Sequence, residues 1–235
     1  MNAEHWVDQA ATVVRKPRYV LRTGAKSAAL LPSTATGLNA LLDSAEPEHI
    51  LKDDRTTTVV KLSVSEKTFI LKRYNPRNQW HKLKRALRKS RARRCWEMSF
   101  EFKRSGLNVS PPVMMFEDRY ALIRMNAYFV NKFLAGDELL TALPNMPDSE
   151  RELVKQAVMQ AFKKLEESRI SHGDMKATNL LWVNGELFFI DLDAAQKHSK
   201  WSLTWSKSHL KDKRRFMKNW QGQPELLALF PGLEC

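Results

Sequence analysis

Carboxylates, amides and a lysine gather in one short segment, Ser171 to Asp193, at the ends of two apolar runs. Asp174, Asn179 and Asp191 carry the hard oxygen atoms that Mg²⁺ prefers, and a carboxylate can also orient a hydroxyl and accept its proton. So many polar groups beside buried strands are tolerated where metal ions and a phosphate-bearing ligand neutralise them. The segment therefore predicts a site for phosphoryl transfer.

The spacing within this segment matches a known catalytic loop. His172, Asp174 and Asn179 follow the pattern H-x-D-x-x-x-x-N of protein kinases, and Asp191 lies twelve positions after Asn179. We expect Asp174 to face the acceptor hydroxyl, and Asn179 and Asp191 to hold Mg²⁺. Upstream, Lys72 on a predicted strand is placed to contact the α- and β-phosphates of a nucleotide.

Three other assignments in the segment rest on the same pattern. Lys176 either reaches the transferring phosphoryl group or is an exposed loop lysine. His172 is expected to brace the loop through its ring nitrogens, without an acid–base role. Asp193 either binds a second metal ion or caps the turn that follows, and capping is the favoured interpretation.

Apolar periodicity and turn signals predict the elements that position these residues. In chain order they are one short helix around 38–42 among loops, a strand hairpin at 57–64 and 68–74, helices at about 80–87 and 91–104, strands at 113–116 and 120–125 joined by a turn at 117–119, a long helix from Ser149 to near Ser168, a hairpin at 180–190 and a helix at about 207–220.

Local signals support three of these elements. Ser149 and Glu152 have the spacing of a capping box at the start of the long helix. Asn184 and Gly185 form the strongest short turn signal between apolar runs. The last helix is expected to turn four side chains inward, namely Leu210, Phe216, Met217 and Trp220.

Charge and composition limit the class of protein. The chain has 235 residues, 43% of them hydrophobic, and a net charge of +13. It has no apolar run long enough for a membrane span, no secretory signal at its start, and only two cysteines, Cys95 and Cys235, which favour a reducing compartment. Eight cations between Lys82 and Arg94, without an acid among them, predict an anionic partner.

Several motifs together resemble the lipopolysaccharide core kinase family, the bacterial enzymes that phosphorylate heptose or Kdo in the inner core. They are "FILKRYN", "SRARRCW", "GLNVSPP", "SHGDMKATNLL", "FFIDLDAAQ" and "KDKRRFMKNWQ", spread over about residues 50–222. The resemblance implies ATP as donor and an α+β, protein-kinase-like two-lobed fold. It implies one domain, with an unassigned extension at about 1–50, a small antiparallel-sheet N-lobe at about 51–125 and a mainly helical C-lobe at about 126–235.

The sequence departs from the general kinase pattern in three places. A segment without glycine, "KDDRTTTVV" at 52–60, stands where kinases have a Gly-rich phosphate loop. Either Glu97 or Glu101 could pair with Lys72, and Glu97 is preferred because it sits mid-helix. Only 44 residues follow Asp191, which argues against a peptide-binding segment and for a small or glycolipid acceptor.

These observations predict an ATP- and Mg²⁺-dependent kinase of a heptose or Kdo sugar of the lipopolysaccharide core. We expect it in the cytoplasm, peripheral on the inner membrane, with the segment Lys82–Arg94 docking on anionic lipid. Nucleic acid is disfavoured as a partner because no recognisable binding motif accompanies the charge. Two alternatives stay open, a kinase of another small molecule or protein, of aminoglycoside or RIO type, and a pseudokinase scaffold on anionic membrane. The oligomeric state is not predicted.

Overall fold

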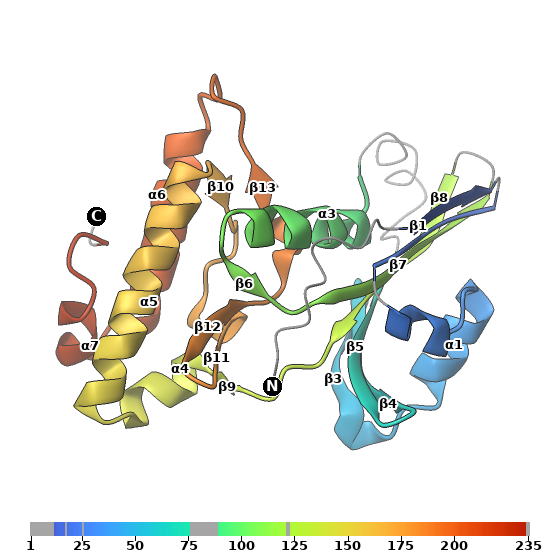
Figure 1. Cartoon of the computed structure of the whole chain (residues 1–235), viewed down its shortest axis with the longest axis horizontal. Helices are drawn as coiled ribbons and strands as arrows, with labels where there is room; N and C mark the ends of the chain where they lie inside the picture. Colours follow the sequence, from blue (N-terminus) through green and yellow to red (C-terminus); the bar gives the residue numbers. More distant parts are fainter. Residues whose placement is uncertain (1–11, 17, 25, 76–88, 121–122, 234–235) are drawn as a thin grey trace. The chain divides into compact units, whose positions relative to one another are not determined.

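The computed structural model describes residues 12–16, 18–24, 26–75, 89–120 and 123–233 (Figure 1). Its described residues form two compact units. The first takes in Met1–Glu97 and Pro111–Phe133, and the second takes in Met98–Ser110 and Leu134–Cys235. The segment Pro111–Phe133 therefore joins the sheet of the first unit, although the predicted boundary between the lobes lies within it.

An antiparallel sheet dominates the first unit. Among the described residues it has seven strands in the order β1-β2-β7-β8-β5-β4-β3. Their bounds are β1 Thr12–Lys16, β2 Tyr19–Thr23, β3 Ile50–Asp54, β4 Thr57–Val64, β5 Lys67–Tyr74, β7 Pro112–Tyr120 and β8 Ile123–Lys132. The 3-10 helices η1, Lys26–Leu30, and η2, Pro47–His49, flank the helix α1, Ala35–Asp43.

The core of the first unit lies between this sheet and α1. Leu38 and Leu42 of α1 are buried against apolar side chains of four strands, among them Phe69, Leu71 and Val130. Thr34 caps α1, because its hydroxyl accepts the N–H of Gly37 at 3.1 Å. The helix around 38–42 is thus confirmed. By contrast, β1 and β2 join the sheet in a region for which the sequence predicted only loops.

The central hairpin agrees with the sequence prediction, whereas the next one does not. β4 pairs antiparallel with β5, and Lys72 lies opposite Val59 of β4 and Phe129 of β8. The turn predicted at 117–119 is wrong, because β7 continues through these residues to Tyr120. Glu117 is buried there, and its carboxylate is 2.7 Å from the guanidinium of Arg119. Because Glu117 and Arg119 pair with each other, these polar residues can lie within β7, although the sequence pattern predicts a strand that stops at Phe116.

The helix α3, Arg91–Arg104, is confirmed at the predicted bounds. It ends because Gly106 adopts φ +71° and the N–H of Leu107 donates to the carbonyl of Phe102 at 3.0 Å. The first part of α3, to Glu97, belongs to the first unit and the remainder to the second. The helix predicted near 80–87 and the residues Lys82 to Arg88 of the basic segment lie outside the described residues, as does Cys235.

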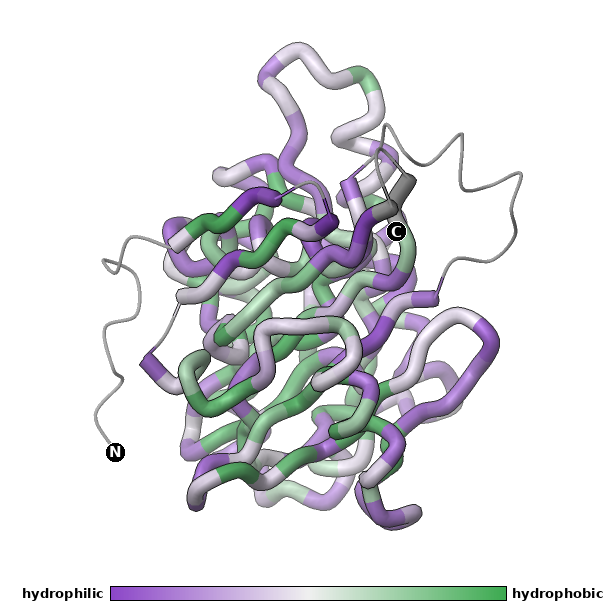
Figure 2. Tube along the Cα trace, turned by 90° about the vertical axis from the view of Figure 1, so that its right-hand side faces the viewer, coloured by the Kyte–Doolittle hydropathy of each residue, from purple (hydrophilic) through white to green (hydrophobic). Residues whose placement is uncertain are grey.

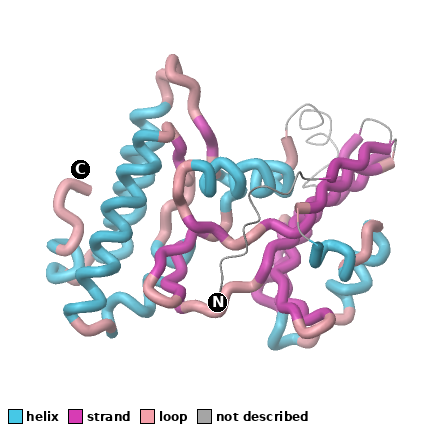
Figure 3. The backbone as a smooth tube through the Cα atoms, in the orientation of Figure 1, coloured by secondary structure: helices cyan, strands magenta, loops and turns pink. Residues whose placement is uncertain are grey.

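Helices and two small sheets build the second unit (Figure 3). One sheet has the order β6-β12-β11-β9, and β10 pairs with β13 in the other. The strands are β6 Asn108–Val109, β9 Asp137–Glu138, β10 Ile170–Ser171, β11 Leu180–Val183, β12 Glu186–Phe189 and β13 Gln196–Lys197. The helices are α4 Leu139–Ala142, η3 Leu143–Asn145, α5 Asp148–Glu167, η4 Ala177–Asn179, η5 Leu192–Ala194, α6 Trp205–Met217, η6 Lys218–Trp220 and α7 Pro224–Ala228.

The long helix is present as α5, but its predicted start is wrong. The N-cap is Pro147, which makes no side-chain cap bond, and Ser149 lies inside the first turn. Glu152 makes no capping box because its carboxylate contacts Lys155 at 2.9 Å, one turn further on. The end at Ser168 is confirmed, since its N–H donates to the carbonyl of Lys164.

The hairpin of β11 and β12 is confirmed in register and turn. Asn184 and Gly185 both have positive φ, 50° and 82°, as a two-residue hairpin turn requires. In α6 and η6 the predicted inward residues Phe216, Met217 and Trp220 are buried, but Leu210 is 38% exposed. Trp205, His209 and Asp212 occupy the buried face instead. Leu210 therefore lies outside the stripe that packs against the unit.

Candidate active site

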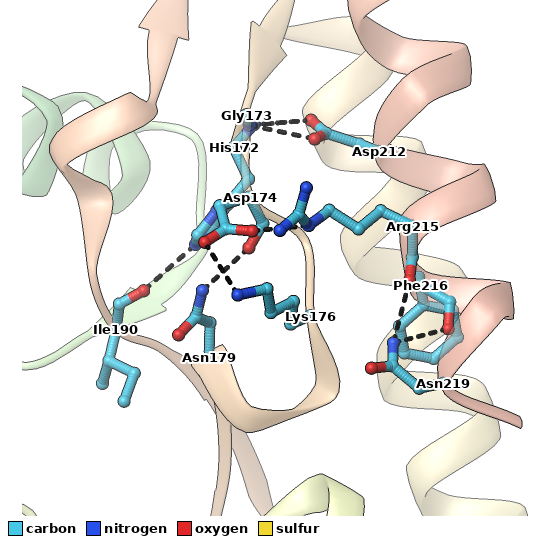
Figure 4. Close-up of polar contacts among 10 residues, drawn as sticks. All are labelled: His172, Gly173, Asp174, Lys176, Asn179, Ile190, Asp212, Arg215, Phe216 and Asn219. Carbon is cyan, nitrogen blue, oxygen red and sulfur yellow. Dashed lines mark hydrogen bonds and ion pairs between the residues drawn. The ribbon is translucent and has the colours of Figure 1, made fainter.

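One carboxylate of α6 holds the polar loop that follows β10 through hydrogen bonds to the loop backbone. Asp212 accepts the backbone N–H of His172 at 2.7 Å and that of Gly173 at 2.9 Å (Figure 4). Gly173 has φ +79°, and a Cβ at this position would lie 2.6 Å from the carbonyl oxygen of Ala194. Only glycine fits there, and the two hydrogen bonds to Asp212 hold the backbone that leads into Asp174.

Asp212 was missed by the sequence analysis, although a signal for it exists. Trp205, His209, Asp212 and Phe216 follow one another at helical spacing, so the aspartate falls on the apolar face of α6. It is 1% exposed. Burial raises the pKa of its carboxyl, and the hydrogen bonds from the loop N–H groups oppose that shift. A carboxylate buried on an apolar face must have a hydrogen-bond donor close to it in space. Here the donors are the backbone N–H groups of His172 and Gly173.

His172 lies inside the second unit with no exposed surface. Its Nε2 is 3.1 Å from the carbonyl oxygen of Ile190, and its ring packs near Phe102 and Phe189. Burial lowers the pKa of this histidine, so the ring is neutral and Nε2–H donates to the carbonyl. These contacts join the catalytic loop to the end of β12 and fit the predicted bracing role.

Two cations flank the carboxylate of Asp174. The Nε of Arg215 lies 2.5 Å from one oxygen, and the Nζ of Lys176 lies 3.6 Å from the other (Figure 4). The side chains of Asp174, Arg215 and Lys176 are 27%, 37% and 45% exposed, so solvent and a ligand can reach the cluster. Arg215 was not singled out in the sequence. It lies three positions after Asp212, on the side of α6 that meets the loop.

Asn179 precedes β11 and Asp191 follows soon after β12, at the open end of the β11–β12 hairpin. The N–H of Ile190 donates to the carbonyl of Asn179 at 3.0 Å, and Leu180 pairs with Phe189. The amide Nδ2 of Asn179 donates to the carbonyl of Asp174 at 2.8 Å, which leaves its Oδ1 as the atom able to bind a cation. The hairpin therefore returns the chain to its starting edge, as its length predicts.

The segment after β12 has an unusual backbone. Asp191 adopts φ 58° and ψ 56°, a left-handed conformation that a residue with a side chain rarely takes. Asp193 follows in η5 and is 9% exposed. No group of three or more His, Cys, Asp or Glu able to hold a metal occurs in the part of the chain that is described. The donor set of Asn179 and Asp191 fits Mg²⁺ that shares its remaining ligands with phosphates and water.

The remaining predicted site residues belong to the first unit. Lys72 lies on β5, in the middle of the sheet, and is partly buried. Glu97 contacts Lys89 at 2.7 Å and Arg93 at 2.8 Å. Partial burial would raise its pKa, but the hydrogen bonds from these two cations outweigh burial and lower it. The basic segment thus has an acidic partner on the next turn of α3, which the sequence analysis did not assign to it.

Glu101, the alternative partner of Lys72, lies in the second unit and has other contacts. Its carboxylate is 2.5 Å from Arg104 and 2.6 Å from Lys197 of β13. These ion pairs occupy both of its oxygens. Both oxygens of Glu97 are occupied in the same way, by Lys89 and Arg93, so these contacts do not distinguish the two glutamates. The pairing of Glu97 with Lys72 stays a prediction.

The glycine-free segment 52–60 forms the turn between β3 and β4. One oxygen of Asp54 accepts the N–H and hydroxyl of Thr56, each at 2.7 Å, and the N–H of Thr57 at 2.8 Å. These bonds lower the pKa of Asp54, the hydroxyl of Thr56 contributing most. A side chain thus closes a turn at the place where protein kinases use glycine. No helix among the described residues is both long and apolar enough to cross a membrane.

Comparisons with known proteins agree with this architecture. A sequence model of the lipopolysaccharide kinase (Kdo/WaaP) family matches residues 44–227. The solved structure of WaaP in complex with acyl carrier protein has a TM-score of 0.59, covers 88% of this chain and 95% of that chain, and is 16% identical, which shows a shared fold.

A more distant curated relative is KEOPS complex subunit Bud32 of Pyrococcus abyssi (strain GE5 / Orsay), which is 28% identical over 130 residues. The match takes in 55% of this chain and 56% of that protein, so the chain spans about half the length of this relative. The family match covers most of the chain and confirms the resemblance seen in its motifs. The chain belongs to the lipopolysaccharide kinase (Kdo/WaaP) family and has a kinase-like fold, with an antiparallel-sheet N-lobe and a mainly helical C-terminal region.

Proposed function

We propose that this protein transfers the γ-phosphoryl group of ATP to a hydroxyl of a heptose or Kdo sugar in the lipopolysaccharide inner core. Membership of a kinase family implies ATP as donor. The observation that carries the proposal is the geometry of Asp174. This partly exposed carboxylate stands on a backbone fixed by Asp212, between the cations Arg215 and Lys176.

Each residue of the catalytic loop then has a chemical role. Asp174 accepts a hydrogen bond from the acceptor hydroxyl, orients its oxygen toward the γ-phosphorus and takes its proton late in the transfer. Lys176 lies beside this carboxylate and can reach the oxygens of the phosphoryl group as they gain charge. His172 holds the loop in place and takes no part in proton transfer, since its ring is buried and neutral.

Roles in binding the donor nucleotide are proposed for residues of each unit separately. Asn179 and Asp191 are the residues that would hold Mg²⁺, and the ion would offset the negative charge of the phosphates. In the first unit, Lys72 contacts the α- and β-phosphates, and Glu97 orients that lysine. Asp193, buried in η5, supports the backbone that follows Asp191; a role in binding a second metal ion is the alternative.

The family and the short segment between Asp191 and α6 both support a sugar as the acceptor. The segment between Asp191 and α6 is short, and α6 begins at Trp205. A peptide-binding segment of protein-kinase type has little room there, so a sugar on a glycolipid is favoured. A kinase of aminoglycoside or RIO type and a weakly active scaffold are the alternatives. The membrane-docking role of Lys82–Arg94 stays a prediction, since most of that segment lies outside the described residues.

Mass spectrometry of core oligosaccharide tests this function directly. Bacteria that lack the gene are complemented with the parent chain, with Asp174→Asn, or with Asp148→Asn, in which a 99% exposed aspartate of α5 is changed. We expect the parent and Asp148→Asn to restore one phosphate on a heptose or Kdo residue, and Asp174→Asn to restore none. Identical core phosphorylation with and without the gene would contradict the proposed acceptor.

A further inference from the structure

The loop that joins β13 to α6 presents two apolar side chains to solvent. Trp201 is 90% exposed and Leu203 is 95% exposed. The next most exposed large apolar residue in the described part of the chain is Leu51, at 56%. The loop extends past the end of α6, and both hydrophobic and hydrophilic residues occur along it (Figures 1 and 2). A single exposed leucine is ordinary, but a tryptophan and a leucine this exposed, two positions apart, are not.

The base of this loop is firmly built, so the exposed tip is a feature of the fold. The N–H of His198 donates to the carbonyl of Arg169 at 2.8 Å, and the Nε of Arg169 donates to the carbonyl of Ser199 at 3.1 Å. The ring of His198 contacts the hydroxyl of Ser171 at 2.8 Å and packs 5.4 Å from the ring of Trp205. The structure thus buries Trp205 at the base and leaves Trp201 outside.

Positive charge surrounds the tip. Between Asp193 and Asp212 the sequence has four lysines and no acidic residue. All four are exposed, namely Lys197, Lys200, Lys207 and Lys211. The acids that approach this region lie at its base, where Glu101 pairs with Lys197 and Glu166 lies 3.8 Å from His209. On α6, the partly exposed Leu210 lies three positions after Lys207, and Lys211 lies four positions after it, so each neighbours Lys207 on the helix surface.

The two exposed apolar side chains and the exposed lysines of this region make a combination suited to binding an anionic lipid bilayer. Tryptophan favours the interfacial region of a bilayer, a leucine gains by entering the acyl boundary, and lysines are attracted to anionic headgroups. A folded acidic protein would satisfy the lysines but needs an apolar pocket of matching shape for both side chains. A fluid bilayer needs no such pocket, so the combination of charge and exposure favours lipid.

We propose that residues 199–204 dock this protein on an anionic lipid bilayer, with Trp201 and Leu203 entering the interface and Lys200, Lys207 and Lys211 contacting headgroups. These residues are not those of the segment Lys82–Arg94, for which the sequence predicts docking on anionic lipid. The proposed docking loop also connects directly to the catalytic loop, because β13 pairs with β10, which leads into His172. The inference does not depend on the proposed function, since vesicle binding requires no phosphoryl transfer.

The test is flotation with vesicles that contain phosphatidylglycerol, beside vesicles of phosphatidylcholine alone. Combining Trp201→Ser with Leu203→Ser should lower the partition coefficient on anionic vesicles by at least about tenfold, because both apolar contacts are lost. The matched control is Leu153→Ser, which removes a 54% exposed leucine from α5 and should bind as the parent does. Changing Lys200, Lys207 and Lys211 to glutamine should weaken binding mainly at low salt.

Several outcomes would overturn the docking surface. It is wrong if the double variant, with an unchanged melting temperature, binds anionic vesicles as tightly as the parent. It is also wrong if light scattering shows a dimer that the double variant converts to a monomer, because a second copy then covers the tip. Asp174→Asn should bind vesicles normally. A protein that binds vesicles through the tip but transfers no phosphate would sink the proposed function and leave this inference standing.

Discussion

Two turns of this protein are organised by an aspartate in the same way but in opposite surroundings. Asp212 accepts two backbone N–H groups of the catalytic loop from a position 39 and 40 residues away in the chain, and it is 1% exposed. Asp54 accepts two backbone N–H groups and a hydroxyl of its own β3–β4 turn, within three residues, and it is exposed. A carboxylate that accepts backbone N–H groups therefore stabilises a contact between distant segments in the second unit and a turn of its own segment in the first.

The surroundings decide what each carboxylate does for the fold. Burial raises the pKa of Asp212, whereas hydrogen bonds to an exposed carboxylate lower the pKa of Asp54. If Asp212 is lost, buried N–H groups are left without partners, but if Asp54 is lost, water replaces it. The catalytic loop should therefore respond strongly to mutation, and the β3–β4 turn only weakly.

The largest effect is expected for Asp212→Ala. The substitution leaves the N–H groups of His172 and Gly173 buried and unpaired, which should lower the free energy of unfolding by roughly 2–5 kcal/mol. Urea denaturation measures the loss. Asp212→Asn, which keeps one acceptor oxygen, should lose less. A loss below about 1 kcal/mol for Asp212→Ala would show that water reaches the loop and that the turn resembles the one at Asp54.

The second largest effect is expected for Arg215, the cation beside the carboxylate of Asp174. Arg215→Ala removes the ion pair with Asp174 and should lower kcat/KM by about 10- to 100-fold, as the loss of one charge-assisted contact does. The neighbouring exposed arginine supplies a control, because Arg214→Ala should leave kcat/KM near the parent value. Activity retained by Arg215→Ala would mean that Lys176 alone orients Asp174.

Acid should destabilise the second unit through its buried histidines. Burial lowers the pKa of His172, His198 and His209 from the ordinary 6.5. Below pH 6.5 the unfolded chain takes up protons that the folded chain does not, so the free energy of unfolding falls as pH falls, by up to about 1.4 kcal/mol per pH unit for each histidine.

Urea denaturation between pH 7.5 and 5.5 measures this slope. His209→Gln should flatten it, while the exposed His49, changed to glutamine in the first unit, should leave it unchanged. Equal slopes in the parent and His209→Gln would show that His209 takes up its proton in the folded state.

The smallest effect is expected for Asp54→Ala. The N–H groups of Thr56 and Thr57 turn to water, so the melting temperature should change little. If the turn covers the phosphates in place of a Gly-rich loop, calorimetry should show that the Asp54→Ala protein binds Mg²⁺–ATP modestly more weakly than the parent. Glu48→Ala, an exposed change just before β3, is the control. A large loss of stability would show that the turn carries tertiary structure as the loop at Asp212 does.

The same contrast explains what the sequence reveals. One local signal was reliable, because Asn184 and Gly185 form the turn that their types predict. Asp212 and Arg215 were missed because their partners lie about forty residues away in the chain. The apolar face of α6 could mark Asp212 as buried, but it could not identify the partner. The capping box failed although Ser149 and Glu152 match the local pattern, because the helix already begins at Asp148 and Glu152 pairs with Lys155. The strands β1 and β2 were missed because they are half exposed and short.

The central claim is that Asp174 acts on the acceptor hydroxyl while other residues hold the nucleotide. The direct measurement compares Asp174→Asn with the parent, by calorimetry with Mg²⁺–ATP and by turnover on purified core oligosaccharide that lacks the phosphate. The account predicts nearly unchanged affinity for Mg²⁺–ATP and loss of turnover. Retained turnover, or an equal loss of affinity and turnover, would contradict it.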